Sequence, residues 1–333
     1  MMEYKIFKEI VEEQFLNYMP EEYKDYSVRI EEVHKTNQTL DGLCLTAPES
    51  KGPAALPTIY INHLYENYLE TGNFPKTMES AVKDLITAYR DMPAEVGNFN
   101  LSHTNGKIIM ALVNTEQNRK MLENIPHRDF HDLSIVYRLM VGTDESGMYS
   151  ALINDRMAEK IGMTEQELYV AAFINTKELL PPMIRGMEEV IKEIMVLSGI
   201  DEEMAVQVLK ETAPKKAMYI LSNSSEVNGA VSMLYEEELH KFAENIGTDL
   251  YILPSSVNEV ILVPAEGEDL MELAQMVTDI NMREVPVGER LSNQVYHYDR
   301  HLRQISLATD TPNKRLDDPV DVLPVYYEPK QIR

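Results

Sequence analysis

The spacing of hydrophobic positions changes several times along the first hundred residues. Over residues 4–18 apolar side chains recur every three or four positions, which predicts an amphipathic helix. Residues 26–45 alternate apolar and polar positions on either side of Thr36-Asn37-Gln38, a pattern typical of a β-hairpin. The next predicted elements are a strand at 58–61, a helix around 64–68 and a helix at 78–89 capped by Thr77. We group residues 1–105 as an N-terminal α+β unit.

The pattern changes in the second third of the chain. Continuous apolar runs at 107–114 and 133–141 predict strands that are buried on both faces. Thr164 and Glu167 form a capping box before the apolar run 168–174, so we expect a helix to begin there. The other elements predicted for this C-terminal unit, residues 106–305, are helices at 183–195, 201–210, 236–246 and 269–282 and strands at 217–222, 228–234, 249–253, 258–263 and 294–298.

These elements place the chain in the α+β class, with mixed sheets flanked by amphipathic helices. Two stretches of the C-terminal unit, 131–162 and 213–247, resemble one another, since both read as hairpin, helix and glycine cap. A duplicated hairpin-helix unit explains this likeness, and so do two unrelated elements with similar turn signals. Residues 306–333 carry four prolines and no sustained period, which predicts an extended tail.

The charge of the chain argues against two kinds of partner. Acidic residues outnumber basic ones by 55 to 31, which gives a formal net charge of -24. A field of this sign repels nucleic acid phosphates and anionic membrane surfaces, so we expect neither as a direct partner. The apolar runs are much shorter than the roughly 20 residues that cross a bilayer. The N-terminus lacks the basic start and apolar stretch of a signal peptide, so we expect a cytoplasmic protein.

Several common kinds of chemistry are missing from the sequence. Cys44 is the single cysteine, so one chain forms no internal disulfide. Glycine loops that cradle phosphates, the G-x-S-x-G elbow and the H-E-x-x-H zinc motif do not occur, and 14 glycines are few for 333 residues. We therefore expect no cofactor and disfavour the common nucleotide enzymes. Whether the protein is an enzyme stays open.

One polar segment, residues 254–259, lies between two strongly apolar predicted strands. Ser255, Ser256 and Glu259 offer two hydroxyls and a carboxylate to a small polar ligand, on a loop that rigid strands would hold. The same residue types satisfy backbone groups in tight turns, and that structural role is the simpler interpretation.

Histidine and arginine side chains supply the other candidates. His127 and His131 are four residues apart beside carboxylates, but Pro126 and the strand that follows argue against the helix that would present both to one metal ion. We expect no metal site there. Arg300 ends the last predicted strand, where an ion pair with a carboxylate is the simpler role.

We predict that strand ends bring six candidates together on one side of the C-terminal unit. The six are His127, Arg128, Ser255, Ser256, Glu259 and Arg300. Because Arg, Glu and Ser are costly to bury without partners, the expected site is a shallow polar pocket rather than a deep apolar one.

Three blocks of sequence stand out together: Pro126-His127-Arg128 with Phe130 and Asp132-Leu133, then Asp249 to Pro264, and Leu291-Ser292 with Val295-Tyr296 and Tyr298-Asp299-Arg300. In these blocks the chain resembles an uncharacterised bacterial family of unknown function, and the resemblance extends from the first helix to about Arg300. It implies a folded protein in a bacterial cytoplasm and brings no catalytic residues. Asn258 stands where that family often has histidine, which weakens any mechanism that needs an imidazole there.

Three functions remain open. The leading hypothesis is a soluble cytoplasmic binding or interaction protein that presents the 254–259 turn to a protein or small-molecule ligand. A hydrolase-type enzyme would instead combine Ser255 or Ser256 with Glu259 and a distant histidine such as His127 or His297. An acidic nucleic-acid mimic that inhibits a DNA-binding protein would use the net charge, although the acidic residues are spread along the chain.

Overall fold

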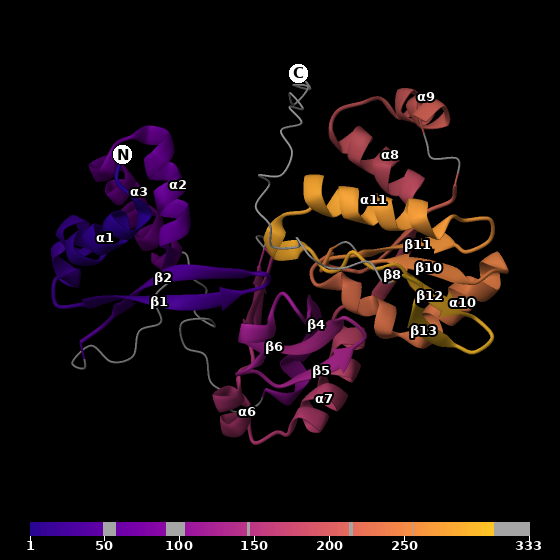
Figure 1. The fold of residues 1–333 in the computed structure, drawn as a ribbon, viewed down its shortest axis with the longest axis horizontal. Helices are drawn as coiled ribbons and strands as arrows, with labels where there is room; N and C mark the ends of the chain where they lie inside the picture. Colours follow the sequence, from indigo (N-terminus) through magenta and orange to yellow (C-terminus); the bar gives the residue numbers. More distant parts are fainter. Residues whose placement is uncertain (49–57, 91–103, 145–146, 213–215, 255, 310–333) are drawn as a thin grey trace. The chain divides into compact units, whose positions relative to one another are not determined.

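The computed structural model describes residues 1–48, 58–90, 104–144, 147–212, 216–254 and 256–309 (Figure 1). The chain divides into two compact units. The first consists of Met1–His103 with Met140–Ser150, and the second of Thr104–Leu139 with Ala151–Arg333. Each combines helices with antiparallel strands, so the predicted α+β class is confirmed. None of the described helices has the length and apolar character that a membrane span requires.

Three helices and a three-stranded sheet form most of the first unit (Figure 1). Its strands are β1 (Ser27–Lys35), β2 (Gln38–Thr46) and β3 (Ile59–Tyr60), and its helices are α1 (Tyr4–Tyr18), α2 (Ile61–Thr71) and α3 (Phe74–Arg90). A single 3-10 turn, Glu21–Tyr23, precedes β1. The predicted hairpin is confirmed: β1 and β2 pair along their whole length, and Asn37 adopts the left-handed conformation in the turn.

The three helices and the hairpin share one hydrophobic core. Phe7, Val11 and Phe15 of α1 are fully buried, at the helical spacing that the sequence predicted. Tyr65 and Tyr68 of α2 pack against Phe7, with ring centroids 5.2 Å from it in both cases. The tyrosines of α2 are therefore packing residues of this core.

Helix α3 begins earlier than predicted. Asn73 Oδ1 accepts the backbone N–H of Lys76 at 3.1 Å, so asparagine makes the capping contact that we expected from Thr77. Thr77 lies inside the helix, where its hydroxyl donates to the Asn73 carbonyl at 3.1 Å. The added turn includes Phe74, whose ring packs edge-on against Phe7.

The second unit contains a six-stranded sheet in the order β13-β12-β10-β11-β9-β8. Its strands are β8 (Pro182–Gly186), β9 (Tyr219–Asn223), β10 (Leu250–Leu253), β11 (Val260–Pro264), β12 (Tyr296–Asp299) and β13 (Gln304–Leu307). Every strand pair with a described register is antiparallel, where we had expected mixed sheets. The short 254–259 connection between β10 and β11 accounts for one such pair, because a tight turn reverses the chain.

A smaller sheet is formed by β4 (Ile108–Asn114), β5 (His127–Phe130), β6 (Leu133–Asp144) and β7 (Gly147–Leu152), with β6 between β4 and β5. Every residue of β4 is buried, as the continuous apolar run predicted. Helix α7 (Glu165–Leu179) packs against β4, and the Thr176 hydroxyl accepts the Met110 N–H at 2.9 Å. The capping box of Thr164 and Glu167 at the start of α7 is confirmed.

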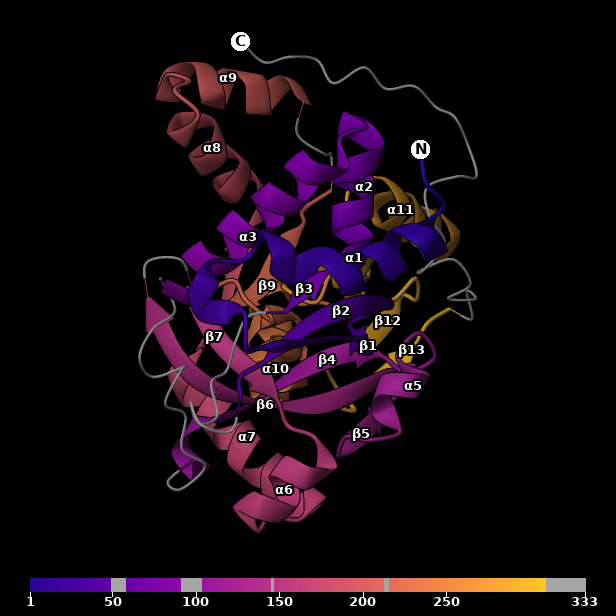
Figure 2. The same ribbon diagram turned by 90° about the vertical axis from the view of Figure 1, so that its left-hand side faces the viewer.

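Helices cover both faces of the six-stranded sheet. They are α8 (Met187–Leu197), α10 (Glu236–Ile246) and α11 (Leu270–Arg283) (Figure 1). Helix α9 (Glu202–Thr212) follows α8, while α5 (Arg119–Leu122) connects β4 to β5 and α6 (Asp155–Ile161) follows β7. Helices α8 and α9 pack on each other as a helical hairpin (Figures 1 and 2). Ile261 and Val263 of β11 contact the core under α11, whereas Tyr219 packs on Phe242 of α10, so α10 and α11 occupy opposite faces.

Three predicted elements were wrong. Residues 182–186 are a strand, so Met183 lies outside α8, and Gly229–Leu234 is a 3-10 helix instead of a strand. Edge strand β13 forms where we had placed the start of the tail, while residues 310–333 lie outside the described part of the chain.

The two similar stretches share only part of their predicted structure. Both contain a helix that ends at a left-handed glycine, Gly162 after α6 and Gly247 after α10. Only the first contains a hairpin, β6 with β7, because the second has the 3-10 helix at that place. A duplication of this unit stays a prediction.

Candidate functional site

The turn between β10 and β11 is built around Ser256. This residue is 3% exposed, and its backbone forms an isolated bridge with Arg290. The Ser256 hydroxyl accepts the Asn258 N–H at 3.0 Å and hydrogen-bonds the Glu259 carboxylate. The turn therefore holds Glu259 in one position at the start of β11.

Asn258 connects this turn to the chain around the 3-10 helix. Its side-chain oxygen accepts the Asn228 N–H at 3.1 Å, and its carbonyl accepts the Ser222 hydroxyl at 2.7 Å. Gly229 packs so closely here that a Cβ atom would meet Ser222 and the Asn258 carbonyl. The Asn258 side chain thus has a structural role, at the position where the family named in the sequence analysis often has histidine.

A cavity of about 200 Å³ opens beside Glu259. Side chains from three strands, helix α8 and two connecting segments line it: Met183, Arg185, Val190, Ile220, Ser222, Glu226, Glu259 and Ile261. Strand pairing explains this grouping, because Ile220 lies opposite both Ile261 and Arg185 in the sheet. The lining therefore combines apolar side chains with the polar groups of Arg185, Ser222, Glu226 and Glu259.

The charges around the cavity are unequally compensated. Arg185 contacts Glu193 and lies 3.6 Å from Glu189, both on α8. In the part of the chain that the structure describes, no ion pair involves Glu226 or Glu259. Burial raises the pKa of the Glu259 carboxyl, the Ser256 hydrogen bond opposes this rise, and the negative charges of Glu289 and Glu226 add to it.

Arg128 contacts helix α7 from strand β5. Its guanidinium binds both carboxylate oxygens of Glu165, at 3.1 and 2.8 Å, and lies 3.9 Å from the ring centroid of Tyr169. The Tyr137 hydroxyl donates to the same carboxylate. Burial works to raise the pKa of Glu165, but the hydrogen bonds from Arg128 and Tyr137 hold it below its usual value. These contacts fasten the first turn of α7 to the small sheet.

His127 and His131 stand on or beside an extended strand instead of a helix. The His127 ring nitrogen Nδ1 lies 2.9 Å from the Ile125 carbonyl, and His131 Nε2 lies 3.2 Å from the Ile305 carbonyl. Among the residues that the structure describes, no three His, Cys, Asp or Glu side chains are grouped as a metal ion would require.

Arg300 lies at the other end of the six-stranded sheet from Glu259. Its backbone N–H donates to Asp249 at 3.2 Å, and its guanidinium is 3.9 Å from Asp249 and from Glu244. In the sheet, Leu250 lies opposite both Tyr298 and Pro264, the last residue of β11. Glu259 precedes the first residue of β11, whereas Arg300 lies beyond the strand end that holds Pro264. At about 3.3 Å per residue, Glu259 and Arg300 are therefore about 13 Å or more apart along the strands.

The structure therefore does not bring the six predicted residues together in one site. Ser256 and Glu259 share one hydrogen-bonded turn, while Arg128 contacts α7 and Arg300 the distant sheet end. Ser255 lies outside the described residues. Ligand binding by Ser256 and Glu259 stays a prediction.

The three distinctive sequence blocks do meet: the second pairs with the third in the sheet, and Asp132 joins the first block to the third. Its carboxylate accepts the Ser292 hydroxyl at 2.6 Å and the hydroxyl of the fully buried Tyr296. Burial, together with the neighbouring carboxylate, raises the pKa of Tyr296 far above its usual value. This contact joins the small sheet to strand β12.

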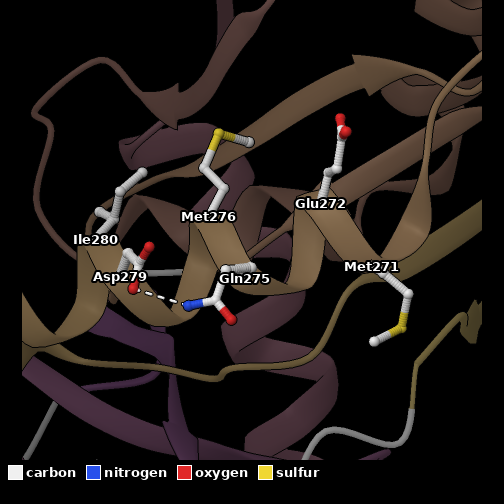
Figure 3. A pocket seen from close by; sticks show the side chains of 6 residues that line it. All are labelled: Met271, Glu272, Gln275, Met276, Asp279 and Ile280. Atoms are coloured by element: carbon white, nitrogen blue, oxygen red, sulfur yellow. Dashed lines mark hydrogen bonds between the residues drawn. The ribbon is translucent and has the colours of Figure 1, made fainter.

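A second hollow, of about 640 Å³, lies along the outer side of α11 (Figure 3). Its lining comes from this one helix: Met271, Glu272, Gln275, Met276, Asp279 and Ile280. Gln275 and Asp279 are joined by a hydrogen bond of 2.9 Å, and Met271 is 76% exposed. Because no other described element closes this hollow, it is an open helix surface rather than an enclosed site.

A family model matches residues 4–300 of the chain, from the start of α1 to the end of β12. The chain belongs to DUF5688, a family of unknown function. The resemblance drawn from the three sequence blocks is thereby confirmed. Searches of curated proteins and of solved structures found no match.

Most of the cavity was missed by the sequence interpretation. Glu259 was identified, but Arg185, Ser222 and Glu226 were not. These residues come from segments that are far apart in the sequence. Arg185 lies in strand β8, which we had predicted as part of a helix, so the sequence pattern did not indicate which sheet face it occupies. Only the correct strand order, which a single sequence does not provide, would have placed them together.

Proposed function

We propose that the protein is a cytoplasmic binding protein that holds a small ligand in the cavity beside Glu259. The observation that carries this proposal is the convergence of separate elements on one concave space. Apolar walls with a few polar groups are typical of ligand sites. At about 200 Å³ the cavity is smaller than the roughly 300–1,000 Å³ of pockets for drug-sized molecules, so the ligand is small.

The contacts of Ser256 support a positioning role over a catalytic one. Its hydroxyl is buried and engaged with Asn258 and Glu259. A serine nucleophile needs a base within hydrogen-bond reach. The histidines proposed for that role have other partners, since His127 contacts the Ile125 carbonyl and His297 contacts Asp249.

The proposal is tested by a ligand-observed NMR screen of small molecules against the full chain. Two variants, Val190→Phe and Ile220→Phe, place extra volume in the cavity, and the matched control Val170→Phe adds the same side chain at a half-exposed position on α7. We expect compounds that bind the unmodified protein and the control and lose binding to both filled variants. If no compound shows this difference, the proposal is wrong.

A further inference from the structure

The cavity beside Glu259 is lined by aliphatic side chains and by carboxylates. Ile220 and Ile261 lie side by side on the sheet, and Val190 of α8 adds a third aliphatic wall. Glu259 and Glu226 contribute carboxylates to the same lining. A ligand that matches both parts has an apolar body and a polar group that complements negative charge.

The one cation of the lining, Arg185, is shared among three carboxylates, because the charge of Glu226 acts on it as well as the two on α8, so it does not fully offset Glu226 and Glu259. Arg185 is 23% exposed and contacts Glu193 and Glu189 of α8. Ser222, the other polar group, donates its hydroxyl to the Asn258 carbonyl. Glu259 receives a hydrogen bond from Ser256 but no ion pair among the described residues. The cavity therefore carries net negative charge on its polar side.

This imbalance has an energetic cost that a bound cation would remove. A carboxylate taken out of water is stabilised only by donors or by opposite charge. Glu259 is partly buried and has Glu226 and Glu289 as negative neighbours. A ligand cation between Glu259 and Glu226 would supply the missing charge, whereas an anion would add to the repulsion.

We propose that the cavity binds a small primary alkylamine, with its ammonium group between Glu226 and Glu259 and its alkyl chain on Ile220 and Ile261. This inference rests on the proposed function and names the ligand class for the same cavity. An ammonium group donates three hydrogen bonds, which suits two carboxylates better than a single one. A short alkyl chain matches the aliphatic side chains of the lining and the small volume.

The test compares three probes of similar size that differ in charge: n-butylamine, n-butanol and butyrate. Met183 lines the cavity, so its methyl resonance reports binding when the methionines carry a ¹³C label. The resonance is assigned by its loss from the spectrum of Met183→Leu. We expect the Met183 signal to shift with n-butylamine in a saturable manner and to remain unchanged with butyrate. Equal shifts with butanol would overturn the ammonium assignment.

Charge variants separate a specific contact from the general attraction of an acidic protein for cations. Glu259→Gln and Glu226→Gln each remove one lining charge, and we expect each to weaken n-butylamine binding by about tenfold or more. Glu159→Gln removes one charge from an exposed position on α6 and should change the affinity by less than about twofold. Equal effects of all three variants would contradict the proposal.

The two proposals fail in different ways. In one outcome n-butylamine gives no shift, while other compounds bind the unmodified protein and do not bind the filled variants Val190→Phe and Ile220→Phe. The ligand class is then wrong and the binding function stands. If neither n-butylamine nor any other compound distinguishes the filled variants from Val170→Phe, both proposals are wrong.

Discussion

Glu259 combines a fixed position with an unfavourable environment. The Ser256 hydroxyl holds the carboxylate, yet burial and the charges of Glu226 and Glu289 disfavour its ionised form. Residues that serve binding are often retained at some expense of stability. The same carboxylate therefore provides a measurable link between folding and pH.

We expect Glu259→Gln to raise the free energy of unfolding at pH 7–8 and to lose this advantage as the pH falls. The pKa of Glu259 is raised in the folded protein, so the folded state binds more protons than the unfolded state between the two pKa values. Its destabilising effect is fully present above the folded pKa and is absent below the unfolded pKa of about 4.3. Arg185 and Glu226 of the cavity and Glu289 beside it are the charged groups involved, and they are unchanged in the variant.

Urea unfolding of both proteins between pH 4 and pH 8 measures this difference. Glu159→Gln, which makes the same change of charge on the surface, serves as the control and should show no such pH-dependent gain. A Glu259→Gln variant that is less stable than the unmodified chain at pH 8 would show that the ionised carboxylate stabilises the fold.

Arg128 gives the opposite expectation, because its contacts support the fold. We expect Arg128→Ala to lower the free energy of unfolding by about 1–2 kcal/mol, since a bidentate pair with Glu165 and a contact with Tyr169 are lost while the site is partly solvent-exposed. Arg156→Ala, at an exposed position on α6, should change it by less than about 0.5 kcal/mol. Chemical denaturation compares the two, and an equal effect of both would refute a structural role for Arg128.

Residue types alone identified Glu259 and Ser256 but could not assign roles to Arg128 or Arg300. The partner of Arg128 is Glu165, 37 positions further along the chain, and the side-chain partners of Arg300 are Asp249 and Glu244. An arginine that binds a ligand and one that binds a distant carboxylate look the same in a sequence. Their difference depends on tertiary contacts, which residue spacing does not contain.

At the scale of elements, hydrophobic periodicity predicted the helices and strands that have one buried and one exposed face. Helices α1 and α10 and the β1–β2 hairpin follow directly from their spacing. Residues 229–234 did not, because all but the last are buried and an apolar run surrounded by protein has no period to read. Strand β8 was missed for a related reason: its residues run without a break into the helical pattern of α8.

The 3-10 helix offers a direct test of this packing. We expect Gly229→Ala to lower the free energy of unfolding by about 1–3 kcal/mol, because a Cβ atom would lie only 2.9 Å from the Asn223 nitrogen and closer still to Ser222 and the Asn258 carbonyl. Gly106→Ala, where a Cβ atom meets nothing within 4 Å, is the matched control and should be neutral or slightly stabilising. Thermal unfolding distinguishes them, and equal melting temperatures would show that the backbone around Gly229 relaxes freely.

At the scale of the whole molecule, charge is the dominant feature. The formal net charge of -24 comes from acidic residues spread along the chain, and the described ion pairs join neighbouring side chains that are mostly exposed. Exposed pairs contribute little, about 0–1 kcal/mol each. Repulsion among the excess carboxylates acts over longer distances and opposes the compact state.

We therefore expect added salt to stabilise the folded protein. Raising sodium chloride from about 0.01 M to 0.15 M shortens the screening distance from about 30 Å to about 8 Å, which weakens long-range repulsion more than contacts between adjacent charges. The melting temperature at pH 7.5 should rise across this range and then level off, since screening is largely complete. A steady rise only at high salt would indicate exclusion of salt from the protein surface instead. A fall in melting temperature between 0.01 M and 0.15 M would mean that the local ion pairs outweigh the repulsion of the excess negative charge.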